Sequence, residues 1–337
     1  MRPAGRNVVG VDRSGNVSSG IKHYTKKLGN ITANIVEIPP GRVRAGIVLG
    51  QNHIGGVEEL GSMAARSGAV AAINGTFFEA YGGRPEPWNT LIKDGRVIHV
   101  GNTGTTVGIT ATGQVKMAPL RIRIEGATNG SYSWPDNWYA YGFNRTPSEN
   151  GVYIYTRERG SSLGFNAGIS VVVNNGRVVD KVHGQDVSIP SNGFVINFTG
   201  SEKYLAERFD VGETVDYRVI FENTGQESWH DVVTAVGAGP RLVTDGQVTV
   251  SPVEEGFTEP KILELATARS AIGVKRDGTV MLVTVPRATI HQLARLMQEA
   301  GAYNAMNLDG GASSGLWLNG KYITKPGRKL SNILVFY

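Results

Sequence analysis

Short stretches in which apolar and polar residues alternate recur along the chain and are separated by turn dipeptides. The clearest stretch covers residues 271–285, with Asp277-Gly278 at its centre. Alternation with a period of two favours a strand, and an Asp-Gly or Asn-Gly pair between two strands favours a hairpin. The same patterns predict strands at 35–49, 91–100, 106–124, 168–183, 193–199, 213–221 and 330–336, with turns at Asp94-Gly95, Thr112-Gly113, Asn175-Gly176, Asp245-Gly246 and Asn319-Gly320.

Two segments have the pattern of a helix. In the better one, the Thr289 hydroxyl can cap the first turn together with Gln292, and Gly301 ends the helix. The other extends from about Val57 to Arg66. We therefore predict an α+β fold dominated by strands, with a large mixed, mostly antiparallel β-sheet core and a few packed helices.

The segments 60–74 and 293–307 follow one pattern without a gap. Each begins with leucine, has a Gly-Ala pair eight residues later, and ends in an apolar strand and an asparagine, Asn74 or Asn307. Helix-to-strand units commonly use a Gly-Ala junction, so the likeness has a purely structural explanation. The functional explanation is that both asparagines face a shared cleft, because open α/β sheets bind ligands at strand ends.

The composition is that of a folded protein and excludes several classes of function. Apolar residues make up 40% of the chain and charged residues 19%, and there is no cysteine, which excludes disulfide frameworks and thiolate metal sites. The net charge of +5 is scattered along the chain, so we predict no nucleic-acid partner. No apolar stretch of about 18 residues predicts a membrane span.

The densest group of polar residues directly follows the apolar segment 303–308. A carboxylate there can act as a base, a nucleophile or a metal ligand, glycines let backbone amides approach a ligand, and hydroxyls donate to phosphate or sugar oxygens. A purely structural turn needs none of these polar side chains. We therefore predict a catalytic carboxylate at Asp309 and substrate-binding groups at Asn307, Gly310, Gly311, Ser313 and Ser314.

A second polar group lies at the end of another apolar stretch. Asn74, Thr76 and Glu79 supply an amide, a hydroxyl and a carboxylate within six residues. Glycoside hydrolysis normally uses two carboxylates, one to assist the leaving group and one to act as nucleophile or activate water. Glu79 is therefore the predicted catalytic partner of Asp309, and Asn74 and Thr76 are predicted to bind substrate.

Two arginines have positions that suit an anionic substrate. Arg269 stands at the start of a predicted strand, and Arg328 lies in the loop before the C-terminal strand. A guanidinium can bind phosphate through two hydrogen bonds, although either arginine could equally be a surface residue. The oxygens near Asp309 would suit a divalent cation, but no ligand spacing establishes one, so no cofactor is firmly predicted.

The segment 126–166 is rich in aromatic residues set among glycine, asparagine and proline. Such rings can stack on sugars, or they can cover the core from a surface loop. Both interpretations stay open at this point. The residues concerned are Tyr132, Trp134, Trp138, Tyr139, Tyr141 and Phe143.

Five segments, taken in chain order, resemble signatures of the phosphodiester glycosidases related to the uncovering enzyme. They are 72–78 (AINGTFF), 237–242 (GAGPRL), 268–273 (ARSAIG), 305–314 (AMNLDGGASS) and 330–335 (LSNILV). The resemblance implies an N-terminal extension at residues 1–30 and a phosphodiester glycosidase domain at residues 31–337. Thr76 departs from the family, which often has glycine there. The family's polar positions fall on Asn74, Arg269, Asn307, Asp309, Ser313, Ser331 and Asn332, and the resemblance adds Ser331 and Asn332 to the predicted substrate-binding residues.

The resemblance implies a hydrolase that cleaves the glycosidic bond of a sugar-1-phosphodiester and releases free sugar and a phosphomonoester. Because this leaving group is acidic, electrostatic support from Arg269 is expected to matter more than a strong general acid. The expected substrate is GlcNAc-1-phosphodiester-like and belongs to a bacterial or phage cell envelope, for example a teichoic-acid or exopolysaccharide linkage. The expected location is extracellular or in the cell envelope, although residues 1–19 show no export signal.

Two other functions fit the same residues. One is a non-catalytic module that binds anionic glycans, and the other is a phosphodiesterase that cleaves the second ester bond.

Overall fold

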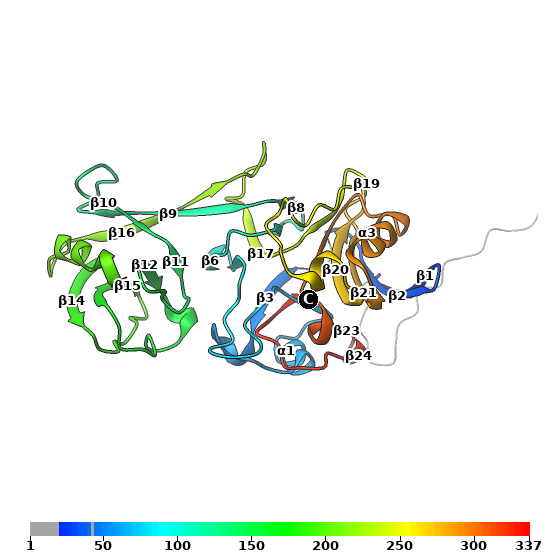
Figure 1. The fold of residues 1–337 in the computed structure, drawn as a ribbon, viewed down its shortest axis with the longest axis horizontal. Helices are drawn as coiled ribbons and strands as arrows, with labels where there is room; N and C mark the ends of the chain where they lie inside the picture. Colours follow the sequence, from blue (N-terminus) through cyan, green and yellow to red (C-terminus); the bar gives the residue numbers. More distant parts are fainter. Residues whose placement is uncertain (1–19, 42–43) are drawn as a thin grey trace, which may run out of the picture.

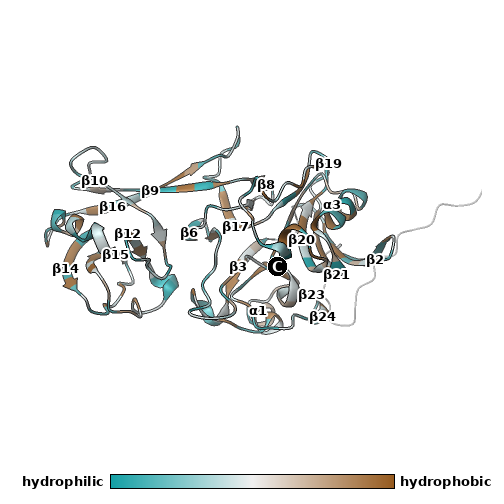
Figure 2. Ribbon diagram, viewed as in Figure 1, coloured by the Kyte–Doolittle hydropathy of each residue, from teal (hydrophilic) through white to brown (hydrophobic). Residues whose placement is uncertain are grey.

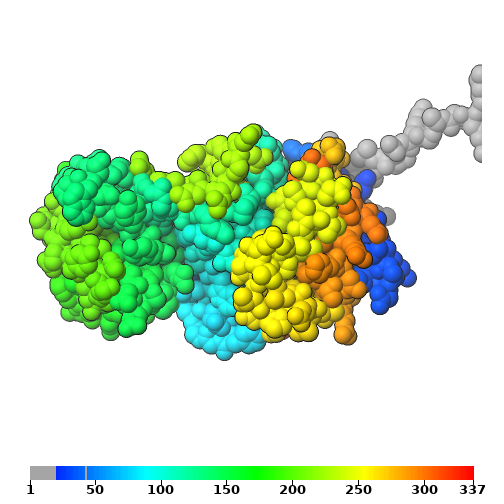
Figure 3. Space-filling model, turned by 45° about the horizontal axis from the view of Figure 1, so that its top comes forward, coloured from blue at the N-terminus to red at the C-terminus, as the bar shows by residue number. Residues whose placement is uncertain are grey.

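The computed structural model describes residues 20–41 and 44–337 and shows two lobes (Figures 1 and 3). Residues 121–222, green in both figures, form the second lobe, and the rest of the described chain forms the first lobe. Residues 1–19 of the predicted N-terminal extension lie outside the described residues. Residues 22–28 of that extension form an edge strand that pairs with the next strand.

Two sheets lie face to face in the first lobe. Ile73 and Leu334 of one sheet share a buried cluster with Ile272 and Met306 of the other. The order of the first sheet is β24 (Lys321–Thr324), β23 (Leu316–Leu318), β4 (Ala71–Asn74), β25 (Asn332–Phe336) and β3 (Ala45–Leu49). The order of the second is β1 (Lys22–Leu28), β2 (Ile31–Ile38), β21 (Val280–Ala288), β20 (Thr267–Val274), β22 (Asn304–Asn307), β18 (Arg241–Thr244) and β19 (Gln247–Val248).

A third sheet closes the side of this core. Its strands β5, β7 and β17 contribute Leu91, Val107 and Val236 to the same buried cluster. Figure 2 shows hydrophobic residues on β3, β17 and β20, one strand from each of the three sheets. The order of the third sheet is β6 (Arg96–His99), β5 (Leu91–Lys93), β17 (Val232–Ala238), β7 (Thr105–Thr110) and β8 (Val115–Ala118).

Each of the two facing sheets carries a helix on its outer face. Alternate residues of the strands point outward, and the apolar ones among them are buried against the helix. Ala72 packs with α1 (Leu60–Arg66), and Ala271 packs with α3 (Ile290–Glu299). The predicted Thr289 cap is confirmed, since its hydroxyl accepts the Gln292 N–H at 3.2 Å. Helix α1 begins later than predicted, because Glu58 pairs as an isolated bridge with Leu330. The other helical elements are α2 (Pro260–Leu263) and the 3₁₀ turns η1 (Gly50–Asn52), η2 (Arg157–Arg159), η3 (Gly200–Arg208) and η4 (Gly311–Ser313).

The second lobe has its own core between two sheets. Trp138 crosses the sheet above Gly126, where a Cβ atom would overlap the indole ring, so this pairing requires glycine. Trp138 and Phe143 of the aromatic segment are buried in this core. One sheet has the order β10 (Asn137–Ala140), β9 (Arg121–Thr128) and β16 (Val215–Glu222), and the other β11 (Gly142–Phe143), β12 (Gly151–Tyr155), β15 (Gly193–Thr199), β13 (Ile169–Asn174) and β14 (Arg177–His183).

The prediction of a strand-dominated, mostly antiparallel fold is confirmed: among the described strands only β11 and β12 pair in parallel. The strands form five sheets and not one large core sheet. The predicted strand 35–49 is two strands in different sheets, because Pro39-Pro40 cannot donate to a ladder. No helix in the described ranges is long and apolar enough to cross a membrane.

A buried ion pair joins the lobes. Nη1 of Arg159, a residue that is 2% exposed, lies 2.9 Å from Oε1 of Glu86 in the first lobe. The Thr146 N–H and hydroxyl also donate to the Glu86 carboxylate, both at 2.7 Å. Arg84 donates from Nη2 to the carbonyls of Ile54 and Arg159, one in each lobe. The segment 79–88 of the first lobe is therefore anchored on the second.

Arg159→Ala should lower the free energy of unfolding by about 3 kcal/mol, because it removes the closer of the two cations beside the Glu86 carboxylate and leaves only Arg84 Nε, at 3.7 Å. Urea unfolding measures the loss. Lys93→Ala, which breaks the exposed pair with Asp94, is the matched control and should cost less than about 1 kcal/mol. Equal losses in the two variants would contradict a stabilising role for the buried pair.

Candidate active site

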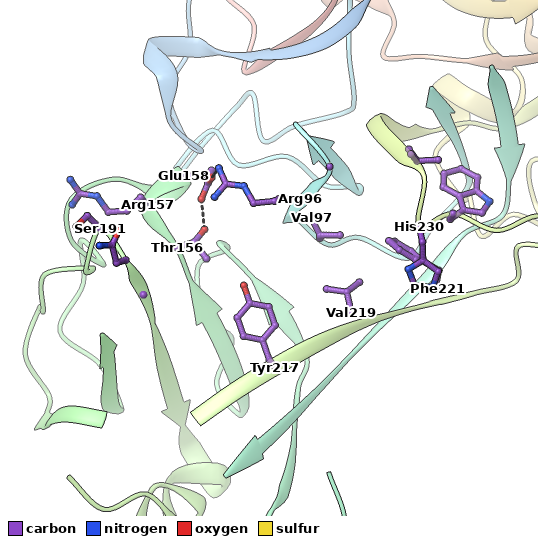
Figure 4. A pocket seen from close by; sticks show the side chains of 15 residues that line it. Arg96, Val97, Thr156, Arg157, Glu158, Ser191, Tyr217, Val219, Phe221 and His230 are labelled. Carbon is purple, nitrogen blue, oxygen red and sulfur yellow. Dashed lines mark hydrogen bonds and ion pairs between the residues drawn. The ribbon is translucent and has the colours of Figure 1, made fainter. Parts of the chain in front are cut away.

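The cleft between the two lobes holds none of the predicted site residues. It has a volume of about 720 Å³ and is lined by Arg96, Glu158 and Tyr217 among others (Figure 4). Its carboxylate, on Glu158, is already bound by Arg96 at 3.2 Å and by the Thr156 hydroxyl at 2.6 Å. The predicted residues gather at another place in the molecule.

That place is a cavity of about 480 Å³ in the first lobe, at the end of β22. Its walls combine one carboxylate from the loop after β22 with cations from three other segments. Of the predicted residues, those that line it are Arg269, Asn307, Asp309, Gly310, Gly311, Ser313 and Arg328. Asn74, Thr76, Ser314, Ser331 and Asn332 are buried beside this wall, and Glu79 lines a neighbouring hollow.

Asn74 holds the loop 309–315 at both ends. Its Nδ2 donates to the Asp309 carbonyl at 2.7 Å, and its Oδ1 accepts the Gly315 N–H at 3.0 Å. Asn307, at the end of the facing sheet, donates from Nδ2 to the Gly239 carbonyl at 2.8 Å and lines the cavity. The two asparagines thus meet at one end of the core, but Asn74 binds backbone there and Asn307 forms part of the cavity wall.

A buried polar layer supports the end of β4. The Thr76 N–H donates to Asn332 Oδ1 at 3.0 Å, and Asn332 Nδ2 donates to Ser331 Oγ at 2.7 Å. A Cβ atom at position 75 would overlap Asn332 Oδ1, so only glycine fits between Asn74 and Thr76. This layer fixes the strand end from which the loop 309–315 is held.

Asp309 has an unusual electrostatic environment for a carboxylate. Burial raises its pKa to about 6, although the Ser313 hydroxyl, the Gly310 N–H at 2.8 Å and the charge of Arg328 favour the ionised form. Carboxylates with raised pKa values in cavities are typical of catalytic sites. Asp309 is therefore the group in this cavity best suited to proton transfer near neutral pH.

Arg269 brings a buried positive charge to the cavity wall. It is 2% exposed, and it donates to the carbonyls of Ala288, Lys261 and Leu265 at 3.1, 2.7 and 2.8 Å. It forms no ion pair within the described ranges, and burial lowers its pKa to about 10. Its contacts hold the segment 261–265, yellow on the surface in Figure 3, beside the cavity.

The rim of the cavity has residues that the sequence analysis missed. Tyr81 and Trp88 expose 79% and 55% of their surface. Arg328 donates from Nη2 to Tyr81 Oη at 3.0 Å, and Lys261 Nζ lies 5.4 Å from the centre of the tyrosine ring. The hydrogen bond from Arg328 and both positive charges lower the pKa of Tyr81. Tyr81 lies two residues past the predicted Glu79, and this proximity was the only sequence signal for it.

Glu79 and Asp309 do not line the same cavity. The Glu79 Oε1 atom accepts the N–H groups of Tyr81 and Gly82 at 2.9 and 3.1 Å and so closes the turn after it. Its hollow, of about 570 Å³, shares Tyr81 and Arg328 with the cavity as a common wall. The second carboxylate in the cavity of Asp309 is Glu259, an exposed residue that precedes α2.

The acidic groups offer little for a metal ion. Among the described residues, no group of three or more histidine, aspartate or glutamate side chains could hold one. Two oxygen donors of the cavity are of the kind that binds a divalent cation. They are the Asp309 carboxylate and Asn307 Oδ1, which is buried and has no hydrogen-bond partner in the described chain.

Solved structures with this fold include proteins from three organisms. A hypothetical protein from Synechocystis has a TM-score of 0.82 at 23% identity over 94% of this chain, which spans 61% of that protein. A protein of Burkholderia pseudomallei described as a candidate exported protein has a TM-score of 0.76 at 22% identity, over 91% of this chain and 74% of that one.

The third is the catalytic domain of zebrafish N-acetylglucosamine-1-phosphodiester α-N-acetylglucosaminidase, auto-inhibited by its pro-peptide, with a TM-score of 0.50 at 14% identity over 94% of this chain and 81% of that one. At these identities the likeness is one of fold. No curated protein matches the chain. The sequence model of the phosphodiester glycosidases, in contrast, matches residues 167–337, a stretch that includes Arg269 and the whole loop that carries Asp309. The chain therefore belongs to the phosphodiester glycosidase family.

Proposed function

We propose that this chain is a hydrolase that cleaves the glycosidic bond of a sugar-1-phosphodiester and releases free sugar and a phosphomonoester. One observation carries this proposal: the wall of a single cavity contains both Asp309, a carboxylate with a raised pKa, and Arg269, a cation without an ion-pair partner in the described chain. The family supports the reaction class, and a GlcNAc-1-phosphodiester is the substrate type that the proposal adopts.

The charges around the cavity favour a substrate with a phosphate. Arg269, Lys261 and Arg328 all line it, and Arg269 has no carboxylate partner in the described chain. A buried cation without a counter-ion is costly, so an anion that enters the cavity relieves this cost as it binds. Nε and Nη2 of Arg269 already donate to backbone carbonyls, so Arg269 offers Nη1 to a phosphate oxygen, and a charge-assisted hydrogen bond of this kind stabilises charge on a departing phosphate.

The remaining walls suit a sugar. Tyr81 and Trp88 offer exposed aromatic surface, and polar groups that fix orientation come from Asn307 and Ser313. The Gly310 and Gly311 backbone lets a ligand approach closely. Asn74, Thr76, Ser314, Ser331 and Asn332 act from behind this wall by holding its shape.

Asp309 must be ionised to act on the anomeric carbon, whether it attacks as nucleophile or removes a proton from water. The bond between the anomeric carbon and the phosphate oxygen then breaks, its electron pair stays on phosphate, and water supplies the hydroxyl of the free sugar. A phosphomonoester is a good leaving group, so the cations matter more than a strong acid. This explains a cavity with cations and a single partly buried carboxylate.

In this proposal Glu79 is not the acid that acts beside Asp309, because it lines the neighbouring hollow. A phosphate bound at Arg328 lies at the wall between the cavity and the hollow of Glu79. Its second ester group would extend into that hollow, where Glu79 contacts the leaving group.

The biological setting follows from the substrate class. Sugar phosphodiesters occur in bacterial and phage cell-envelope glycans, so we propose an extracellular or cell-envelope location. The fold is shared with a Burkholderia pseudomallei protein described as a candidate exported protein, which supports this setting.

Asp309→Asn should lower the rate of sugar release from a GlcNAc-1-phosphodiester by at least about 10³-fold, because it removes the ionisable group at the anomeric carbon. Chromatography of the products measures the rate and identifies the sugar. Full activity in the variant would remove Asp309 from the mechanism. Release of sugar phosphate by the wild type would favour cleavage of the second ester bond, and binding without turnover would favour a glycan-binding module.

The activity should fall as the pH drops through about 6, because the ionised form of Asp309 is lost there. A profile of kcat/KM between pH 4.5 and 8 measures this. A rate that rises towards pH 5 would instead assign Asp309 as an acid.

Thermal unfolding supplies the control for this assignment. A folded-state pKa above the ordinary value means that protonated Asp309 stabilises the fold fully below about pH 4, and that this contribution is lost as the pH rises through about 6. Asp309→Asn should therefore have a higher Tm than the wild type at pH 8, and the difference should disappear towards pH 4.

Arg328→Gln should reduce kcat/KM about 10- to 100-fold, the equivalent of one or two charge-assisted hydrogen bonds to phosphate. Steady-state kinetics with the same diester measure it. Arg96→Gln, in the cleft between the lobes, is the matched control and should leave kcat/KM unchanged. Equal effects of the two variants would mean that overall charge, and not contact with the phosphate, is responsible.

A further inference from the structure

One face of the β10-β9-β16 sheet in the second lobe carries a row of exposed aromatic rings. Tyr139 is 44% exposed, Tyr141 66% and Trp134 81%. Tyr139 lies on β10 and faces away from the core of the lobe, into which Trp138 and Ala140 point, while Trp134 precedes this strand and Tyr141 directly follows it. Large aromatic rings that stay exposed to water forgo the free energy that burial would contribute. Exposed groups of such rings therefore often mark a binding surface.

Polar side chains order this row. Asn137 donates from Nδ2 to Tyr139 Oη at 3.2 Å, and Arg208 donates from Nη2 to the Asn137 carbonyl at 2.8 Å. The Arg208 guanidinium also lies 5.4 Å from the centre of the Trp134 ring. These contacts link Trp134, Arg208, Asn137 and Tyr139 into one surface, and Tyr141, two residues after Tyr139, is exposed next along the chain.

We propose that this aromatic row, formed by Trp134, Asn137, Tyr139, Tyr141 and Arg208, is a second carbohydrate-binding surface that holds an extended polysaccharide bearing acidic groups. The flat rings stack on sugar faces, and the Asn137 amide and the tyrosine hydroxyls bond to sugar hydroxyls. Arg208 forms no ion pair with any described residue, so its charge is free for a carboxylate or phosphate of the chain.

The composition of the row suits a glycan. An amide and a guanidinium lie among the rings, and these groups can bond to the hydroxyls and acidic substituents of a sugar chain.

The charges argue against nucleic acid. On the same sheet, Arg218 is bound by Glu125 at 2.7 Å and Arg123 by Glu222 at 2.9 Å. The sheet therefore lacks the continuous positive track that a nucleic-acid backbone requires. A glycan with acidic groups at intervals needs only the single free cation that Arg208 supplies.

The row shares no lining residue with the cavity of Asp309. The Arg159–Glu86 ion pair joins the two lobes, so a polymer bound on the row, at the far end of the second lobe (Figure 1), would be tethered to the molecule that carries the cavity. Tethering of this kind raises the local concentration of cleavable linkages without changing the chemistry. Binding on the row does not depend on the proposed hydrolysis.

Calorimetric titration with a hyaluronan hexasaccharide, which is acidic, and with chitohexaose, which is neutral, tests the proposal. The wild type should bind both and should bind the acidic chain more tightly. The triple variant Trp134→Ala, Tyr139→Ala, Tyr141→Ala should bind each at least about tenfold more weakly, because it removes all three stacking rings. Arg208→Gln should weaken only the binding of hyaluronan. Val253→Ala, an equally exposed site in the first lobe, is the control.

Four results would overturn the proposal. These are no binding of either glycan by the wild type, unchanged binding in the triple variant, tighter binding of a twelve-residue oligo-dT than of hyaluronan, and displacement of the glycan by saturating N-acetylglucosamine 1-phosphate, which would place it in the cavity. Circular dichroism checks that the triple variant folds, and Tyr141→Ala alone replaces it if it does not, with a loss of about threefold or more expected.

Discussion

The geometry of the candidate active site depends on one side chain, Asn74. Its amide group satisfies a carbonyl at the start of the loop 309–315 and an N–H at the end of it. The loop leaves β22 of one sheet and ends at β23, which pairs with β4, the strand of Asn74, in the facing sheet. The bond to Asp309 therefore joins the two sheets, and the bond to Gly315 fixes the end of the loop within the sheet of Asn74. If either hydrogen bond of Asn74 broke, a buried backbone group of the loop would be left without a partner, which costs free energy. The position of Asp309 therefore depends on the packing of the whole lobe.

The same enclosure that positions Asp309 sets its chemistry. A carboxylate and a guanidinium in water would keep their ordinary pKa values, but here burial raises that of Asp309 to about 6 and lowers that of Arg269 to about 10. The two groups do not neutralise each other through an ion pair, since Arg269 directs its donors to three backbone carbonyls. The fold thus tolerates opposite charges that are each incompletely compensated, a state typical of sites that stabilise charge in a bound substrate.

Local patterns predicted what local physics determines. The period-two stretches, the Thr289 cap and the polar loop after β22 were all visible, because alternation, capping and strand-end chemistry depend on neighbouring residues. The pairing of strands was not, since alternation identifies a buried face without naming its partner. For the same reason the second lobe went unpredicted: Arg159 and Glu86, which attach it, are 73 residues apart and carry no mutual signal in the sequence. Glu79 was assigned by spacing alone, whereas Glu259, which lines the cavity with Asp309, lies in an unremarkable exposed segment.

For the segments 60–74 and 293–307 the sequence allowed two explanations, a common helix-to-strand junction and a cleft that both asparagines face, and neither describes the structure in full. The units α1–β4 and α3–β22 lie on opposite sides of one core, each helix on the outer face of its own sheet, so both strands deliver an asparagine to the same end. The two positions then differ in function. Asn74 has both side-chain atoms bound to backbone, while Asn307 binds backbone only through Nδ2 and leaves Oδ1 without a partner in the described chain. Of two equivalent strand ends, one therefore serves as a structural clamp and the other forms part of the cavity wall.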